Sequence, residues 1–187
     1  LVCGWIIRRP IFGLMRFYRT ATEFGPVAHL DRNGVLDYNI IQERDKNMAW
    51  KIDPGASKVE FTIKHLMVSK VRGRFESFEG TLNMDEEDPQ ASSIEGTIDT
   101  ASIRTGFGLR DNSLRSAAYF DVKRFPQMSF QSTRIGPFEG DKFQVSGDLT
   151  IKGTTHPVAF DIVNKGEGSD AQDGRRWIFQ ASIVLNR

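Results

Sequence analysis

From Ala49 onward, apolar residues recur at every second position over most of the chain, and this period of two is what most restricts the fold. In residues 58–64, Val59, Phe61 and Ile63 fall on one face and charged or polar residues on the other, as in a strand with one side in water. The same alternation returns at 94–98, 143–151, 158–162 and 179–185. We therefore expect about seven strands and no crossover helices, which indicates an all-β antiparallel sheet curled into a barrel.

Residues 102–126 interrupt the alternation. Asp111 is expected to cap a short helix in which Leu114 and Ala118, four positions apart, share a face. Phe125 and Pro126 then return the chain to extended geometry. This stretch predicts one short helical plug set into the barrel.

The first 47 residues differ from the rest. Their first four basic residues precede the first acidic one, as in a targeting peptide or a membrane-lying arm, yet Pro10 and Gly13 interrupt the helix that either would need. No apolar segment follows a basic one, as a secretory signal requires. We expect residues 1–47 to be a poorly ordered or non-native extension and residues 48–187 to form the domain. Because no secretory signal is visible, the sequence favours a location in the cytoplasm, with the periplasm as the alternative.

Composition narrows the possible functions. A net charge of +1 offers no field for holding nucleic acid. The single cysteine, Cys3, can form neither an internal disulfide nor a structural zinc site of paired cysteines, and His29 and His156 lack partners at metal-ligand spacing. No stretch approaches the roughly 20 apolar residues of a membrane-spanning helix. No nucleophile motif of the Gly-x-Ser-x-Gly type is present, so we expect neither a metal site nor catalysis.

Several phrases carry a family resemblance. They include WKIDP at 50–54, FTIKHL at 61–66, VSKVRGRF at 68–75, ASIRTG at 101–106, YFDV at 119–122, GDLTIKG at 147–153 and THPV at 155–158. With these phrases in this order, residues 49–186 resemble the YceI-like family of polyisoprenoid-binding, lipocalin-like proteins. Ala56 and Ser113 stand where that family usually has histidine.

The resemblance implies an extended eight-stranded barrel whose apolar bore holds an isoprenoid lipid, with a polyprenyl or quinone-type tail. It implies a binder or carrier without a cofactor other than that lipid, and it suggests homodimers. It also implies a further hairpin after Arg187. On that basis we expect a C-terminally truncated barrel with unpaired edges.

The predicted wall of the bore consists of apolar residues on the inward face of the strands and in the plug. They are Phe61, Ile63, Phe75, Phe78, Leu82, Ile98, Leu114, Phe120, Met128, Phe130, Phe143, Val145, Leu149 and Phe160. Because Phe75 and Phe78 differ in parity, a bulge or bend is expected near Ser77. By periodicity alone, a filled barrel without a cavity fits these residues equally well.

Three polar residues are candidates for the rim of the bore or for contact with a ligand head group. His65 follows a strand and could equally be a hydrogen-bonded structural histidine. Arg110 and Asp111 lie in the plug, where they could pair with the barrel rim instead.

Two other functions fit the alternation. The first is a structural or stress-response module that acts through protein partners and has no lipid ligand. The second is an outer-membrane barrel whose apolar residues face lipid. Lipid binding in the bore is the preferred interpretation.

Overall fold

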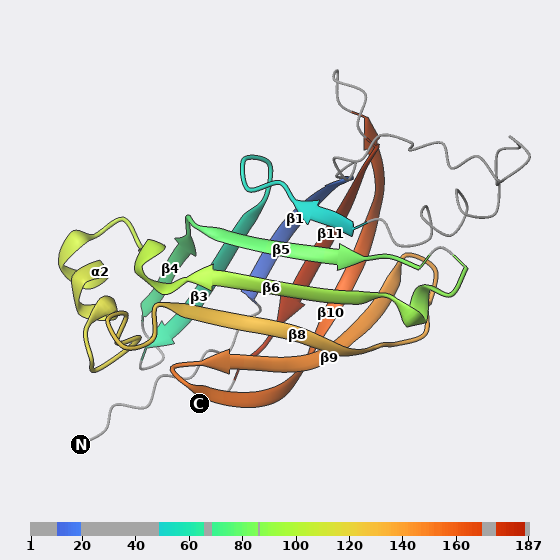
Figure 1. Cartoon of the computed structure of the whole chain (residues 1–187). Coiled ribbons are helices and arrows are strands. Elements are labelled where there is room, and N and C mark those ends of the chain that lie inside the picture. The colour runs from blue at the N-terminus through green and yellow to red at the C-terminus, as the bar shows by residue number, and fades with distance from the viewer. Residues whose placement is uncertain (1–10, 20–48, 66–68, 86, 170–174, 186–187) are drawn as a thin grey trace, which may run out of the picture.

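The computed structural model describes residues 11–19, 49–65, 69–85, 87–169 and 175–185. One antiparallel sheet of eleven strands contains all the strands of this part of the chain (Figure 1). The strands are β1 (Ile11–Arg19), β2 (Ala49–Ile52), β3 (Lys58–His65), β4 (Ser69–Phe75), β5 (Phe78–Asn83), β6 (Ser93–Asp99), β7 (Ile103–Arg104), β8 (Gln127–Ile135), β9 (Lys142–Ile151), β10 (Thr154–Ser169) and β11 (Arg175–Ile183). The all-β antiparallel fold with one short α-helix is confirmed.

Eight of the strands close into a barrel. Around the ring they follow the order β1, β11, β10, β9, β8, β6, β5 and β2, and β2 pairs with β1 again. The remaining strands, β3, β4 and β7, extend the sheet from the N-terminal half of β1. The predicted bend near Ser77 is the break between β4 and β5.

The strand β1 was not expected, because it lies within the first 47 residues. It pairs with β11 from Ile11 to Tyr18, and on its other side with β3 through residues 12–14 and with β2 through residues 17–19. Phe17 is buried and Met15 half-buried, so their burial offsets the entropy of ordering this segment. The edge of β11, which we expected to be unpaired, is covered by β1. The rest of the expected extension lies outside the described residues.

The helix α2 (Gly108–Arg115) lies at the end of the molecule where β3, β4 and β7 meet (Figure 1). It begins three residues before Asp111, so the predicted N-cap position is wrong: Phe107 is the N-cap, and Asp111 lies in the first turn. The helix also ends before Ala118, which is exposed and shares no helical face with Leu114. The carboxylate of Asp111 instead accepts hydrogen bonds from Thr105, outside the helix.

The buried residues form three clusters along the barrel. The cluster beneath α2 contains Phe61, Phe75, Ile103, Leu114 and Met128, among others. The other two surround Trp50 and Val145 and include side chains from β1, β9, β10 and β11. The α2 end of the barrel is therefore packed. A cavity can lie only in the rest of the barrel interior, away from α2.

Candidate functional site

A cavity of about 530 Å³ occupies the interior of the barrel. Its size falls within the range of roughly 300–1,000 Å³ that is usual for small-molecule sites. Aromatic side chains make up much of its wall: Phe17, Phe75, Phe78, Phe130, Phe138, Phe143, Phe160, Trp177 and Phe179. Most of the residues that line the cavity are apolar, so burial of apolar surface is what it can offer a ligand.

Ten of the fourteen residues predicted for the bore line this cavity. They are Phe75, Phe78, Leu82, Ile98, Met128, Phe130, Phe143, Val145, Leu149 and Phe160. The interior is thus not filled by protein along its whole length. Contact of these residues with a lipid stays a prediction.

The other four predicted residues belong to the packed α2 end. Phe61, Ile63 and Leu114 are buried in the cluster beneath the helix, and Phe120 packs against that cluster. The rings of Phe61 and Phe75 lie 5.4 Å apart, and Phe120 meets Phe75 edge to face at 5.9 Å. These four residues close the barrel and do not line the cavity.

Sequence reasoning missed part of the wall. Met15 and Phe17 of β1 line the cavity, as do Trp177, Phe179, Ala181 and Ile183 of β11. The inward face of β11 follows from the alternation of apolar residues at 179–185. Met15 and Phe17 lie on either side of the charged Arg16, a spacing of two that also fits a strand, and Pro10 and Gly13 argue only against a helix.

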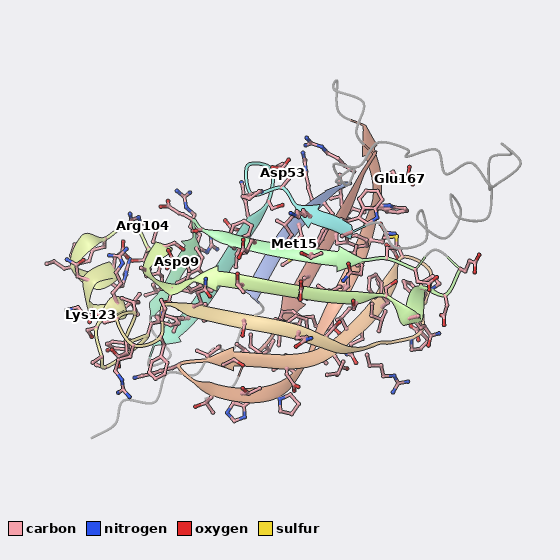
Figure 2. The ribbon with its side chains drawn as sticks, viewed as in Figure 1. Met15, Asp53, Asp99, Arg104, Lys123 and Glu167 are labelled. Carbon is pink, nitrogen blue, oxygen red and sulfur yellow. The ribbon has the colours of Figure 1, made fainter. Side chains whose placement is uncertain are left out.

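The end of the cavity away from α2 is lined by polar as well as apolar residues. It is formed by Met84, Asp85, Pro89 and Ser92 between β5 and β6, by Phe138 before β9, and by Asn164, Glu167 and Trp177 on β10 and β11. Figure 2 shows Glu167 at the far end of the molecule from Arg104 and Lys123, which lie near α2. The described lining residues include four acidic ones, of which Glu79, Glu95 and Glu167 are exposed and Asp85 is half-buried, and none is lysine, arginine or histidine.

Asn164 has a fixed orientation at this end. Its side-chain oxygen accepts a hydrogen bond from the backbone N–H of Gly166 at 2.8 Å. Since only the amide oxygen can accept that bond, the side-chain NH₂ group is directed elsewhere, and no described residue accepts a hydrogen bond from it. Ser92 Oγ accepts a bond from the backbone N–H of Asp85 at 2.9 Å and keeps its own proton to donate.

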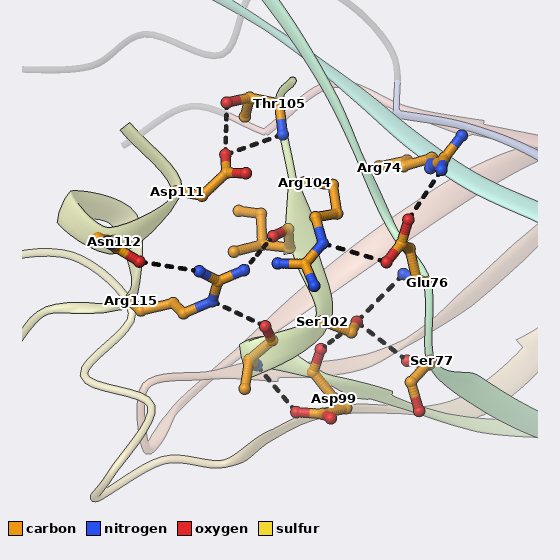
Figure 3. Close-up of polar contacts among 12 residues, drawn as sticks. Arg74, Glu76, Ser77, Asp99, Ser102, Arg104, Thr105, Asp111, Asn112 and Arg115 are labelled. Carbon is orange, nitrogen blue, oxygen red and sulfur yellow. Dashed lines mark hydrogen bonds and ion pairs between the residues drawn. The ribbon is translucent and has the colours of Figure 1, made fainter. Parts of the chain in front are cut away.

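Arg110 and Asp111 lie outside the cavity. Asp111 belongs to a polar network that fastens α2 to the barrel (Figure 3). Asp111 is buried and accepts hydrogen bonds from the backbone N–H and the hydroxyl of Thr105, at 2.9 and 2.5 Å. Arg110 donates to the hydroxyl and the carbonyl of the same Thr105. Burial raises the pKa of the Asp111 carboxyl, but the bonds from Thr105 and the charges of Arg115 and Arg104 outweigh it, so the pKa lies below its ordinary value.

Arg115 and Glu76 complete this network. Arg115 donates to the carbonyls of Ala101 and Ile103, at 2.8 and 2.7 Å. Glu76 forms ion pairs with Arg74 and Arg104 on the outer face of the sheet, and the hydrogen bond from Arg74 lowers the pKa of its carboxyl. The helix that covers the packed end is thus held by polar bonds as well as by Leu114.

The remaining polar candidate, His65, lies in β3, but its side chain is outside the part of the chain that the structure describes. Among the described residues, no three His, Cys, Asp or Glu side chains are grouped so as to hold a metal ion. No helix within the described ranges has the length and apolar character needed to cross a membrane.

Comparison with known proteins places this fold. Protein YceI of Salmonella newport (strain SL254) is 41% identical over 123 residues, which cover 66% of this chain and 64% of that protein. Protein YceI of Salmonella arizonae matches to the same extent. The chain thus spans somewhat less than two thirds of the length of these relatives.

Two solved structures are similar to this one in fold. The YCEI protein of Campylobacter jejuni superimposes with a TM-score of 0.55 at 28% identity, over 64% of this chain and 70% of that one. BcnA of Burkholderia cenocepacia, at 24% identity, shares the fold with a TM-score of 0.59, over 71% of this chain and 99% of that one. The model of the YceI-like domain matches residues 50–187, and the chain therefore belongs to the YceI-like domain family.

Proposed function

We propose that this protein binds a long-chain isoprenoid lipid, with a polyprenyl or quinone-type tail, in the cavity of its barrel. The observation that carries the proposal is the cavity of about 530 Å³ inside the barrel, walled mainly by aromatic and aliphatic side chains. Burial of an apolar tail contributes about 25 cal/mol per Å² of buried surface. This contribution needs no directional contacts, so polar groups in the wall are not needed to hold the tail. The role is that of a binder or carrier and not of a catalyst.

The shape of the wall suits a flexible branched chain. Phe130 and Phe160 meet edge to face at 4.9 Å, and Phe143 and Phe179 do so at 6.1 Å, which leaves the ring faces and edges directed at the same interior space. Isoprene units are methyl-branched and partly unsaturated, and such groups pack well against ring faces and edges. The packed cluster beneath α2 sets the inner limit of the tail.

The first test is to identify what the protein carries. Organic extraction of the purified full chain, followed by mass spectrometry, is expected to release an isoprenoid. The extracted protein, refolded with geranylgeraniol, is expected to take the alcohol up and to melt at a higher temperature in its presence. Failure to yield or take up any isoprenoid would contradict the proposal and would favour a module that acts through protein partners.

A variant that fills the cavity tests the location. Ala181 is buried and lines the cavity, so Ala181→Trp places an indole in the space proposed for the tail. Uptake of geranylgeraniol is expected to fall at least about tenfold, because a bulky side chain and the lipid cannot share one space. The matched control is Gln180→Trp, the neighbouring position on the opposite face of β11, where uptake should not change.

A further inference from the structure

We infer that the end of the molecule that carries α2 docks on the surface of an anionic lipid bilayer. Two apolar side chains enter the interfacial layer, and four basic side chains lie against the lipid phosphates. We call these six residues the α2 surface: Phe107, Leu109, Arg110, Lys123, Arg124 and Lys152. None of them lines the cavity, so the inference does not depend on what the cavity binds.

Two large apolar side chains are exposed close together at the start of α2. Phe107, the N-cap residue, is 55% exposed, and Leu109, in the first turn, is 74% exposed. Among the described residues, Phe138 and Val184 are the other large apolar side chains that are exposed. Apolar residues scattered singly on a surface are normal, whereas apolar residues grouped within a polar rim are typical of contact sites. Phe107 and Leu109 form the apolar part of the α2 surface.

The charge around this pair is basic. Residues 100–126 contain five basic and two acidic residues. Both acidic residues, Asp111 and Asp121, are buried, whereas Lys123 and Arg124 are exposed. The charge that this segment presents to solvent is therefore positive.

The fold places basic side chains at both ends of α2. Cζ of Arg110 lies 5.8 Å from the centre of the Phe107 ring. Nζ of Lys152, in the turn between β9 and β10, donates a hydrogen bond to the carbonyl of Ala117 at 2.8 Å, just after the helix ends. Because eight helical residues span only about 12 Å, both cations lie close to the apolar pair.

Lys123 and Arg124 also lie against α2. The backbone N–H of Val122, the residue before Lys123, donates to the carbonyl of Arg115, the last residue of the helix, at 3.2 Å. Figure 2 shows Lys123 at this end of the molecule. Basic side chains from the helix, from the segment after it and from the turn between β9 and β10 thus surround one small apolar area.

The two ends of the barrel differ in charge. At the α2 end, the exposed Glu76 is shared by Arg74 and Arg104, so this group is also basic overall. The turn at 85–88, between β5 and β6 at the opposite end (Figure 1), consists of four acidic residues in the sequence. An anionic surface attracts one end and repels the other, which turns α2 toward the lipid. Binding at such a surface increases with the apolar area inserted and with the attraction of basic residues to anionic lipids.

The experiment measures co-sedimentation of the full chain with vesicles of two compositions. One is phosphatidylcholine alone, and the other is equal parts of phosphatidylcholine and phosphatidylglycerol. Binding to the mixed vesicles is expected to be at least about tenfold tighter, because each basic residue near an anionic surface adds to the attraction. Salt at about 1 M, which screens charges beyond about 3 Å, should remove most of this difference. Equal binding to both vesicles, or binding to neither, would overturn the inference.

A double variant tests the basic part of the α2 surface. Lys123→Gln combined with Arg124→Gln is expected to weaken binding to the mixed vesicles at least about tenfold. The control combines Arg134→Gln with Lys142→Gln, which removes two exposed basic residues at the ends of β8 and β9 away from α2. It should change binding by less than about twofold, since exposed charges far from the lipid are screened. Equal losses in both double variants would show that net charge, and not the α2 surface, attracts the vesicles.

Leu109 tests the apolar part. Leu109→Gln keeps a good helix former and is expected to weaken binding to the mixed vesicles at least about fivefold, because it removes inserted apolar area. Leu109→Trp should strengthen binding, since indole rings favour the interface. Both variants should take up geranylgeraniol like the unaltered chain, because Leu109 does not line the cavity, and this separates the test from that of the proposed function. If neither variant changes vesicle binding, α2 does not dock on the bilayer.

Discussion

The backbone N–H of Arg16 donates a hydrogen bond to the hydroxyl oxygen of Ser57, 2.8 Å away. This bond lies where β1 passes the turn between β2 and β3, so that neither strand offers a ladder partner. The carbonyl of Arg16 accepts from the backbone N–H of Asp53 at 2.7 Å at the same place. A side chain and a turn thus replace the missing rungs, and β1 stays paired along its length.

Replacement of Ser57 should destabilise the barrel. In Ser57→Ala the N–H of Arg16 loses its partner at a position where Ser57 is buried, and an unsatisfied buried donor costs about 1–3 kcal/mol. The free energy of unfolding, from urea denaturation, is expected to fall by that amount. Ser113→Ala, at an exposed position on α2, is the control and should change it by at most about 0.5 kcal/mol. Equal effects of the two substitutions would mean that the bond does not hold β1.

Truncation of Phe17 tests whether β1 belongs to the core. Phe17 is 3% exposed and meets Phe179 edge to face at 5.9 Å. The loss of its ring leaves a space between β1 and β11, and Phe17→Ala is expected to lower the free energy of unfolding by about 3–5 kcal/mol. The matched control is Phe107→Ala, since Phe107 is 55% exposed and contributes at most about 1 kcal/mol through its contact with Arg110. A small effect at Phe17 would show that the barrel is stable without this strand.

Part of the fold and of the cavity wall could be predicted from the sequence. Alternation assigned the inward faces of β3, β6, β9, β10 and β11 correctly because the face of a strand is a local property. Alternation could not predict how far along the barrel each inward residue lies. For this reason the predicted bore included Phe61 and Leu114, which lie in the packed end. The pairing of β1 with β11 depends on an edge more than 150 residues away, which no local pattern encodes.

Polar partners were the least predictable part. Asp111 has the residue type of a helix cap, but its carboxylate accepts a hydrogen bond from Thr105, which lies six residues earlier and outside the helix. Arg110 and Asp111 were candidates for head-group contacts because both are charged residues in the plug. Their charge indicates that they have polar partners, but it does not identify these partners. The donors at the other end, on Asn164 and Ser92, carry no motif at all.

Asp111→Asn should make the stability depend less on pH. The pKa of Asp111 lies below its ordinary value, so the ionised carboxylate stabilises the fold above the unfolded-state pKa of about 3.9, and this contribution is lost as the pH falls through the folded-state pKa. At neutral pH the variant is expected to be less stable by about 1–3 kcal/mol. The difference should narrow below about pH 4, as measured by urea denaturation over a pH series. Asp148→Asn, at an exposed position, provides the comparison, and a difference that stays constant on acidification would contradict the assigned role.

Gly147 tests how closely neighbouring strands approach inside the barrel. A Cβ atom at this position would clash with the carbonyl oxygen of Gln131 and would lie 2.6 Å from the ring of Phe130. Because one obstacle is backbone, Gly147→Ala is expected to lower the free energy of unfolding by about 1–3 kcal/mol or more. Gly108→Ala is the control, since nothing lies within 4 Å of its Cβ position. A neutral effect at Gly147 would mean that β8 and β9 can shift apart at low cost.

The divided pairing of β1 has a mechanical consequence. Its residues pair with β11 on one side and with β2 and β3 on the other, so the loss of β1 would break the pairing with all three strands at once. Such a strand does not fray from one end as an ordinary edge does. Any opening of the barrel wall at β1 should therefore be cooperative, with the whole strand leaving or none of it.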